Sequence, residues 1–348
     1  MPAKIKVLIV DDSALVRRLL RDIMIDDPEL DVIGTASNGI EAIRMVTELD
    51  PDVVTMDIHM PEMDGLTALE YIMKKSPRPV VMLSALAQKG AIPTIKALEL
   101  GAVDFIAKPS HFPSAVKEVR EEVLEKVKMA ASSRGFVQRG LAASSTRRKL
   151  KLRLPSTPRE KLVIIGSSAG GPKALADIFP LFPSNLPAAM IIVQHMPGVF
   201  TRSFAERLDS RSELSIKEAE QGDMLEAGKV LVAPGGFDLF LVENRKRQGL
   251  EVRLVESKSK YGATPHIDTT LISAAEAYQE NSIGVIMTGM GSDGAKGTTA
   301  IKEKMGKTVA QNEETCLVFG MPKAAIETRC VDWVVPLEQI PETILSLL

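Results

Sequence analysis

The 348-residue sequence has few cysteines and aromatics, almost no net charge and no long apolar run. Two cysteines, Cys316 and Cys330, are too few for a disulfide framework or a zinc cluster. A formal net charge of −2 gives no electrostatic reason to expect nucleic acid or an anionic membrane as partner. No apolar run could span a bilayer, and the charged start lacks the apolar region of a secretory signal. We therefore expect a cytoplasmic protein with reduced thiols, which binds no nucleic acid and does not insert into a membrane.

Short β-branched runs alternate with helical patterns in the first third of the chain. Amphipathic periodicity predicts helices at 14–24 and 40–49 and a closing helix at 113–131. The predicted strands are 5–10, 30–36, 51–58, 78–85 and 102–109. Near-continuous apolar strands between helices indicate a parallel sheet covered on both faces. Five such units fit one compact α/β domain, to which we assign residues 1–125.

A second alternation follows a stretch without sustained periodicity. Residues 132–159 are rich in Ser, Ala, Arg and Lys, which favours a solvated linker over a nucleic-acid-binding arm. We therefore assign 126–159 to a linker and 160–348 to a second domain. Its predicted strands are 161–166, 188–195, 229–234, 282–289 and 307–312, and the alternating runs of 238–257 predict a β-hairpin. We expect a doubly wound, mostly parallel α/β sheet with some antiparallel edge.

Polar residues collect at the predicted strand ends of the first domain, where chemistry gathers in open α/β sheets. They are Asp11, Asp12, Asp57, Ser84 and Lys108. Three carboxylates in one crevice repel each other, and a divalent cation with oxygen ligands, Mg²⁺, resolves that conflict. Taken singly, each has a plain structural alternative: "DDS" reads as a helix N-cap, Asp57 as a turn residue and "KP" as a strand exit.

The stretch "GSSAG" places Ser168 between Gly166 and Gly170, a G-x-S-x-G spacing between a strand and a helix. Glycines there permit a sharp turn that exposes a serine hydroxyl at the sheet end, and main-chain N–H groups at the helix start suit an oxyanion. The P-loop and dinucleotide-binding patterns are both absent. The turn alone leaves two interpretations open, a nucleophile and a structural corner.

A nucleophilic serine needs a base, and the chain has four histidines: His59, His111, His195 and His266. The first two lie in the first domain or at its edge. His195 ends the strand run "AMIIVQH", which predicts the same sheet edge as Ser168. His266 is predicted to start a helix and could instead line the pocket.

The third residue of a triad is a carboxylate that orients the imidazole. Asp293, in the glycine-rich loop after the strand run "GVIMTG", is the preferred candidate. Its structural alternative is a turn or cap residue. Asp268 and Asp238 compete with it, although neither directly follows a strong strand.

The motifs "VLIVDDSALVRRLL", "VVTMDIHMPEMDGL", "MLSAL" and "GAVDFIAKPS" resemble the two-component receiver domain over nearly all of residues 4–125. The resemblance implies a flavodoxin-like (βα)5 fold with Asp57 as phosphoacceptor. The implied Mg²⁺ ligands are Asp11, Asp12, Asp57 and the main-chain carbonyl of His59. Ser84, Phe105 and Lys108 match the phosphoryl-sensing and switch positions, and a chemotaxis histidine kinase is the implied phosphodonor.

The motifs "VIIGSSAGGPKAL", "IIVQHMPGVFTRSFAERL", "VLVAPGG", "PHIDTTL" and "VIMTGMGSDGAKG" resemble the catalytic domain of the CheB chemotaxis methylesterases over about residues 160–345. The resemblance implies Ser168 as nucleophile, His195 as base and Asp293 as orienting acid, with the N–H groups of Ala169 and Met290 as oxyanion donors.

The same resemblance implies what the protein acts on and how it is controlled. The substrates would be glutamyl methyl esters and specific glutamines of chemoreceptors, hydrolysed without a cofactor in that domain. In the family, the unphosphorylated receiver covers the catalytic cleft and phosphorylation loosens that packing. The alternatives are a response regulator whose second domain only binds a partner, and a transcriptional regulator that uses the basic linker.

Overall fold

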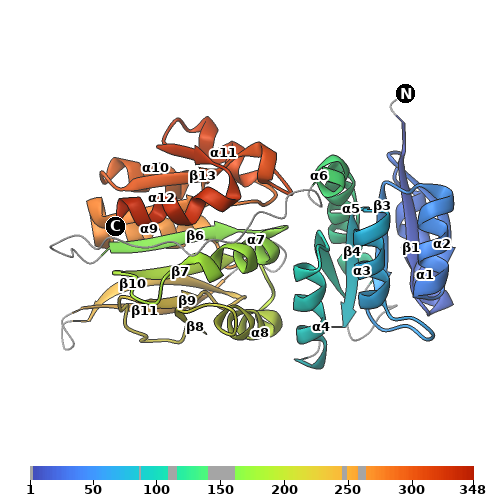
Figure 1. The fold of residues 1–348 in the computed structure, drawn as a ribbon, viewed down its shortest axis with the longest axis horizontal. Coiled ribbons are helices and arrows are strands. Elements are labelled where there is room, and N and C mark those ends of the chain that lie inside the picture. The colour runs from blue at the N-terminus through green and yellow to red at the C-terminus, as the bar shows by residue number, and fades with distance from the viewer. Residues whose placement is uncertain (1–2, 86–87, 109–115, 140–160, 245–248, 258–263) are drawn as a thin grey trace. The chain divides into compact units, whose positions relative to one another are not determined.

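The computed structural model describes all residues except 1–2, 86–87, 109–115, 140–160, 245–248 and 258–263 (Figure 1). The chain divides into two compact units, Met1–Ser144 and Ser145–Leu348. Within the described ranges, no helix is long and apolar enough to cross a bilayer.

The first unit is built on a five-stranded parallel sheet with the strand order β2-β1-β3-β4-β5. Among its helices, α1 packs against α5, while α2 contacts α3 and α3 contacts α4. This arrangement confirms the predicted flavodoxin-like fold. The strands are β1 (Ile5–Val10), β2 (Leu30–Ala36), β3 (Val53–Asp57), β4 (Val80–Ala85) and β5 (Asp104–Lys108); the helices are α1 (Ala14–Ile25), α2 (Gly39–Leu49), α3 (Gly65–Lys75), α4 (Gln88–Glu99), α5 (Val116–Ser132) and α6 (Arg134–Arg139).

Local sequence explains where the first helices begin. The side chains of Ser13, Asn38 and Asp64 each accept a hydrogen bond from a main-chain N–H in the first turn of α1, α2 and α3 respectively. Such caps satisfy donors that a helix leaves without partners at its start. The N-cap interpretation of "DDS" is therefore correct for Ser13, but it does not account for Asp11.

Helix α6 (Arg134–Arg139) lies in the stretch where we expected no regular structure. Its six residues are too few to show a helical period in the sequence, yet Val137 is buried at 4% exposure. Residues 140–159 of the predicted linker lie outside the described residues. The predicted division at residues 125 and 160 therefore stays a prediction.

The second unit contains a seven-stranded sheet with the order β14-β13-β12-β6-β7-β9-β8, in which every pairing is parallel. Its strands are β6 (Lys161–Ser167), β7 (Ala188–Gln194), β8 (Ser215–Glu218), β9 (Lys229–Val232), β12 (Ser282–Ile286), β13 (Lys307–Gln311) and β14 (Trp333–Val335). Its helices are α7 (Gly171–Ile178), α8 (Gly198–Asp209), α9 (Ile267–Tyr278), α10 (Ala295–Glu303), α11 (Met321–Glu327) and α12 (Ile340–Leu347).

The predicted hairpin is confirmed as β10 (Phe237–Asn244) and β11 (Gly249–Glu256), which pair antiparallel. The expectation that it forms an antiparallel edge of the main sheet is wrong, because the two strands form a separate sheet in which β10 packs against α9. The edges are instead β8 and β14, which the sequence did not predict. They have four and three residues, too few for a recognisable apolar run.

The order of the central strands determines where the candidate catalytic site lies. β6 lies between β7 and β12 (Figure 1). After β6, the chain first forms the strands on the β7 side of the sheet and later those on the β12 side. A crevice forms outside the strand ends at such a reversal and is the usual ligand site of doubly wound sheets. The segments that follow β6, β7 and β12 therefore meet at one edge.

Helix α9 offers a test of which contacts stabilise the second unit. Leu271 is fully buried in its core, whereas the adjacent Ile272 is 38% exposed. We expect Leu271→Ala to lower the free energy of unfolding by about 2–5 kcal/mol, and Ile272→Ala by about 0.5 kcal/mol or less. Trp333, the one tryptophan of the chain, belongs to this unit, so its fluorescence during urea unfolding measures both. Equal losses would contradict the packing described here.

Candidate functional site

The first unit brings the predicted carboxylates together at the ends of neighbouring strands. Asp11 follows β1 and is fully buried, and Asp57 ends β3, the neighbour of β1. One carboxylate oxygen from each of Asp11, Asp12 and Asp57 lies within 4.8 Å of the other two. His59 is exposed on the loop that follows Asp57, and its main-chain carbonyl is the one predicted to bind Mg²⁺.

Lys108 is the cation of this cluster. Its Nζ lies 2.6 Å from Asp11 Oδ2 and 2.9 Å from Asp57 Oδ2. One ammonium offsets only part of the charge of three carboxylates. Burial raises the pKa of Asp11 in spite of the contact with Lys108. An oxygen-only donor set with excess negative charge fits Mg²⁺, and Asp11, Asp12 and Asp57 are the side chains that would hold it.

The predicted switch residues have partners that the sequence did not indicate. The Ser84 hydroxyl is 2.6 Å from the Thr94 hydroxyl on α4, and both side chains are buried. Phe105 is buried at 3% exposure, and Lys126 Nζ lies 5.3 Å from its ring centroid and donates to its carbonyl at 2.6 Å. Thr94 and Lys126 stand in ordinary helical sequence, and no local pattern marks them.

The second unit brings the predicted triad to the edge formed by β12, β6 and β7. Ser168 follows β6 and His195 follows β7, and the last paired residues of these strands are Ser167 and Gln194. Asp293 lies in the loop between β12 and α10. Each predicted residue thus comes from a different one of three adjacent strands.

His195 is hydrogen-bonded to Asp293. Nε2 of His195 is 2.9 Å from Asp293 Oδ2, and the side chains are 6% and 18% exposed. Burial opposes ionisation of Asp293, but hydrogen bonds from His195 and from the N–H groups of Asp268 and Ile267 outweigh it and hold the pKa of Asp293 below its usual value. The carboxylate is therefore ionised near neutral pH.

This hydrogen bond determines which ring nitrogen of His195 is available. An ionised carboxylate only accepts hydrogen bonds, so Nε2 must carry the proton when the imidazole is neutral. Nδ1 then has the free lone pair. It is buried and has no hydrogen-bond partner among the residues that the structure describes. The site thus contains an unprotonated, unpaired nitrogen of the kind that a general base requires.

Ser168 is half-buried beside the loop that carries Asp293. Its N–H donates to Thr288 O at 3.0 Å. A Cβ on Gly289 would lie 2.8 Å from Ser168 Cβ, so only glycine permits this approach. No hydrogen bond joins Ser168 to His195, since Nε2 is bonded to Asp293 and Nδ1 has no partner among the residues that the structure describes. Such contacts often tighten only when substrate binds.

The predicted oxyanion donors flank the serine. Ala169 follows Ser168 and precedes Gly170, which has φ 76° at the start of α7. Met290 follows Gly289 and is 36% exposed. Their main-chain N–H groups donate to no residue in the described part of the chain.

The two competing carboxylates have other partners. Asp268 Oδ1 accepts hydrogen bonds from the N–H groups of Gly294 and Gly297 and so caps α10. Burial and the nearby charge of Asp293 raise the pKa of Asp268 in spite of these bonds. Asp238 Oδ1 lies 2.8 Å from Nδ1 of His266, the N-cap residue of α9. Of the three candidates, only Asp293 contacts His195 among the described residues. His111 lies outside those residues.

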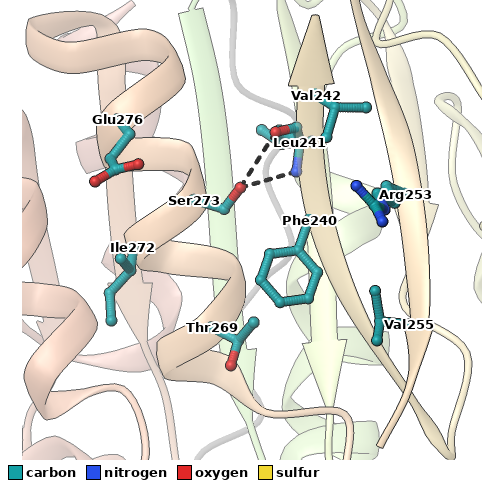
Figure 2. Close-up of a pocket in the computed structure, with 9 residues that line it drawn as sticks. All are labelled: Phe240, Leu241, Val242, Arg253, Val255, Thr269, Ile272, Ser273 and Glu276. Carbon is teal, nitrogen blue, oxygen red and sulfur yellow. Dashed lines mark hydrogen bonds between the residues drawn. The ribbon is translucent and has the colours of Figure 1, made fainter.

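A separate groove of about 490 Å³ lies between the hairpin and α9 (Figure 2). Phe240, Val255 and Ile272 give it an apolar lining, and Ser273 is hydrogen-bonded to Leu241 at its side. None of the predicted site residues lines this groove.

Comparison with known proteins assigns each unit to a known family. The family described as CheB methylesterase matches residues 163–344, and the response regulator receiver domain matches residues 7–120. A receiver and a methylesterase domain on one chain define a response regulator with an enzyme as its output domain.

Relatives that span the whole chain make the identification more specific. A Pyrococcus horikoshii protein named protein-glutamate methylesterase/protein-glutamine glutaminase is 52% identical over 349 residues, which cover 99% of this chain and 94% of that protein. A Thermotoga maritima protein of the same name is 45% identical over 345 residues, 99% of this chain and 98% of the relative. The crystal structure of the Thermotoga maritima CheB methylesterase catalytic domain has a TM-score of 0.53 at 46% identity, covering 55% of this chain and all (100%) of that one. The chain belongs to the CheB methylesterase family.

The carboxylate cluster of the first unit can be tested by metal binding. Removing the charge of Asp12 should weaken Mg²⁺ binding about tenfold or more, because affinity depends on the number of charged ligands. Titration calorimetry of Asp12→Asn measures this change. Asp22→Asn is the control, since Asp22 is exposed on α1 and paired with Arg18. Equal affinity in both variants would contradict the assignment.

Proposed function

We propose that this protein is a phosphorylation-activated protein-glutamate methylesterase that also deamidates glutamines, and that its substrates are chemoreceptors. The observation that carries the proposal is the His195–Asp293 hydrogen bond at the sheet edge where the half-buried Ser168 lies. Membership of the CheB methylesterase family supports the reaction class, and the names of the relatives support protein glutamate and glutamine side chains as the groups acted on.

The proposed reaction begins when the Oγ of Ser168 attacks the ester carbonyl and Nδ1 of His195 takes the Ser168 hydroxyl proton. The N–H groups of Ala169 and Met290 would stabilise the resulting oxyanion. Asp293, kept ionised by its hydrogen bonds, stabilises the imidazolium that forms. Collapse of the intermediate breaks the C–O bond, and His195 returns the proton to the departing methanol.

Water then attacks the acyl-enzyme, with His195 again as base, and releases the glutamate carboxylate and free Ser168. A glutamine side chain would follow the same course, with ammonia as the leaving group. These steps use only side chains and main-chain groups of the second unit.

We further propose that the receiver unit controls this reaction through Asp57. A histidine kinase of the chemotaxis system would supply the phosphoryl group. When bound, Mg²⁺ would neutralise part of the negative charge on the phosphoryl group and the carboxylates during that transfer. Lys108 is in contact with Asp57, and the Ser84–Thr94 hydrogen bond links the end of β4 to α4, so a phosphoryl group at Asp57 has a route to bias the position of that helix.

The alternative that the second unit only binds a partner predicts no catalysis. Nδ1 of His195 is buried and has no partner in the described part of the chain, which disfavours this alternative, because an unsatisfied polar atom costs stability. The transcriptional-regulator alternative depends on the basic stretch of 132–159, most of which lies outside the described residues.

Methanol release from methylated receptor membranes tests the reaction and its control together. We expect the full-length protein to be faster with a small phosphodonor and Mg²⁺ than without. Asp57→Asn should abolish this increase, because it removes the phosphoacceptor. Ser168→Ala should lower kcat by about a thousandfold or more, whereas Ser210→Ala, at an exposed position after α8, should not.

Two results would count against the proposal. Activity of Ser168→Ala equal to that of the wild type would refute the catalytic assignment. Activation of Asp57→Asn by the phosphodonor would refute the assigned phosphoacceptor while leaving the esterase intact.

A further inference from the structure

We infer that Gln194 is a positioning residue, whose buried amide holds the main chains of Ser168 and His195 in register for proton transfer. The inference rests on the proposed function, because it concerns the nucleophile and base assigned there. Gln194 is the last residue of β7, directly precedes His195 and is 2% exposed.

The Gln194 side chain contacts both predicted catalytic residues through their main chains. Its Nε2 donates to Ser168 O and to His195 O, each at 3.0 Å. Its Oε1 accepts a hydrogen bond from Ser167 Oγ at 2.7 Å. Carbonyl oxygens only accept, so the amide nitrogen must face them and the orientation of the amide is fixed.

These hydrogen bonds join β6 and β7 beyond the last main-chain pairing of the two strands. The last paired residues are Ser167 and Gln194, so Ser168 and His195 lie one residue past the regular pairing. One planar group then joins the two residues across the strands. Without it, the two carbonyls would lose a donor, and only the main-chain bond from His195 N–H to Ser167 O, at 3.1 Å, would still join the strands here. Small shifts between Ser168 and His195 would then matter for proton transfer.

Gly171 shows that this arrangement takes up the available space. A Cβ at Gly171, the first residue of α7, would lie 2.1 Å from Gln194 Oε1 and 2.7 Å from Ser167 Oγ. The helix that follows the serine can therefore approach the strand ends only with glycine there. Any side chain at Gly171 would displace the amide while leaving all of its hydrogen-bonding groups present.

The test is the methanol-release assay with Gln194→Met, which keeps the size of the side chain and removes both donors. We expect kcat to fall about tenfold to a hundredfold. KM should change less than about threefold, because a side chain that is 2% exposed cannot contact substrate. Labelling of Ser168 by a fluorophosphonate should slow by the same factor as kcat.

Thr308→Val is the control. Thr308 is also buried, near the start of β13, and its hydroxyl donates to Cys330 O and binds Asp332, away from the strand ends that carry Ser168 and His195. Both variants should lower the melting temperature, but only Gln194→Met should lower kcat. An equal loss of kcat in the two variants would reduce the role of Gln194 to general stability and overturn the inference.

Gly171→Ala provides a second route if Gln194→Met does not fold, and the same loss of kcat with little change in KM is expected. Wild-type kcat in Gly171→Ala, or in folded Gln194→Met, would overturn the inference. Failure of the proposed function is distinguishable, because the wild-type protein itself would then release no methanol and would not be labelled at Ser168.

Discussion

The 2.9 Å hydrogen bond between His195 Nε2 and Asp293 Oδ2 is the contact on which the account of the second unit depends. It directs the proton of a neutral imidazole to one nitrogen and leaves the other, Nδ1, as a buried acceptor without a partner in the described residues. Many serine hydrolases use these two nitrogens in the opposite roles. Either nitrogen can act as the base, provided that it comes within hydrogen-bond distance and alignment of the serine hydroxyl while the other nitrogen binds the carboxylate.

Asp293 can accept this hydrogen bond because the fold keeps its carboxylate ionised although most of the side chain is buried. Main-chain N–H groups at the start of α9 donate to it, and Asp268 in turn caps α10 and fixes the loop. The receiver site uses the same location, the carboxyl ends of parallel strands, for a different purpose. There the carboxylates outnumber the ammonium group of Lys108, and the excess charge suits a metal ion.

Much of this arrangement could be predicted from the sequence, for a physical reason. Buried parallel strands need continuous apolar runs, so the strands at 5–10, 80–85 and 161–167 were recognisable within a residue or two. Short elements such as β8, β14 and α6 bury too little to leave a pattern. The sequence favoured Asp293 but could not decide against Asp268 and Asp238, because the hydrogen-bond partners of all three carboxylates come from distant segments. Gln194 had only a weak signal in the sequence, a polar residue at the end of an apolar strand run.

The protonation state of His195 is the most direct test of this account. Nitrogen-15 NMR of the imidazole, in full-length protein at a pH where the ring is neutral, distinguishes the protonated nitrogen from the unprotonated one. The resonances can be assigned by their loss in His195→Gln. The account predicts a proton on Nε2 and a lone pair on Nδ1, and a loss of this preference in Asp293→Ala. A proton on Nδ1 in the wild-type protein would contradict it.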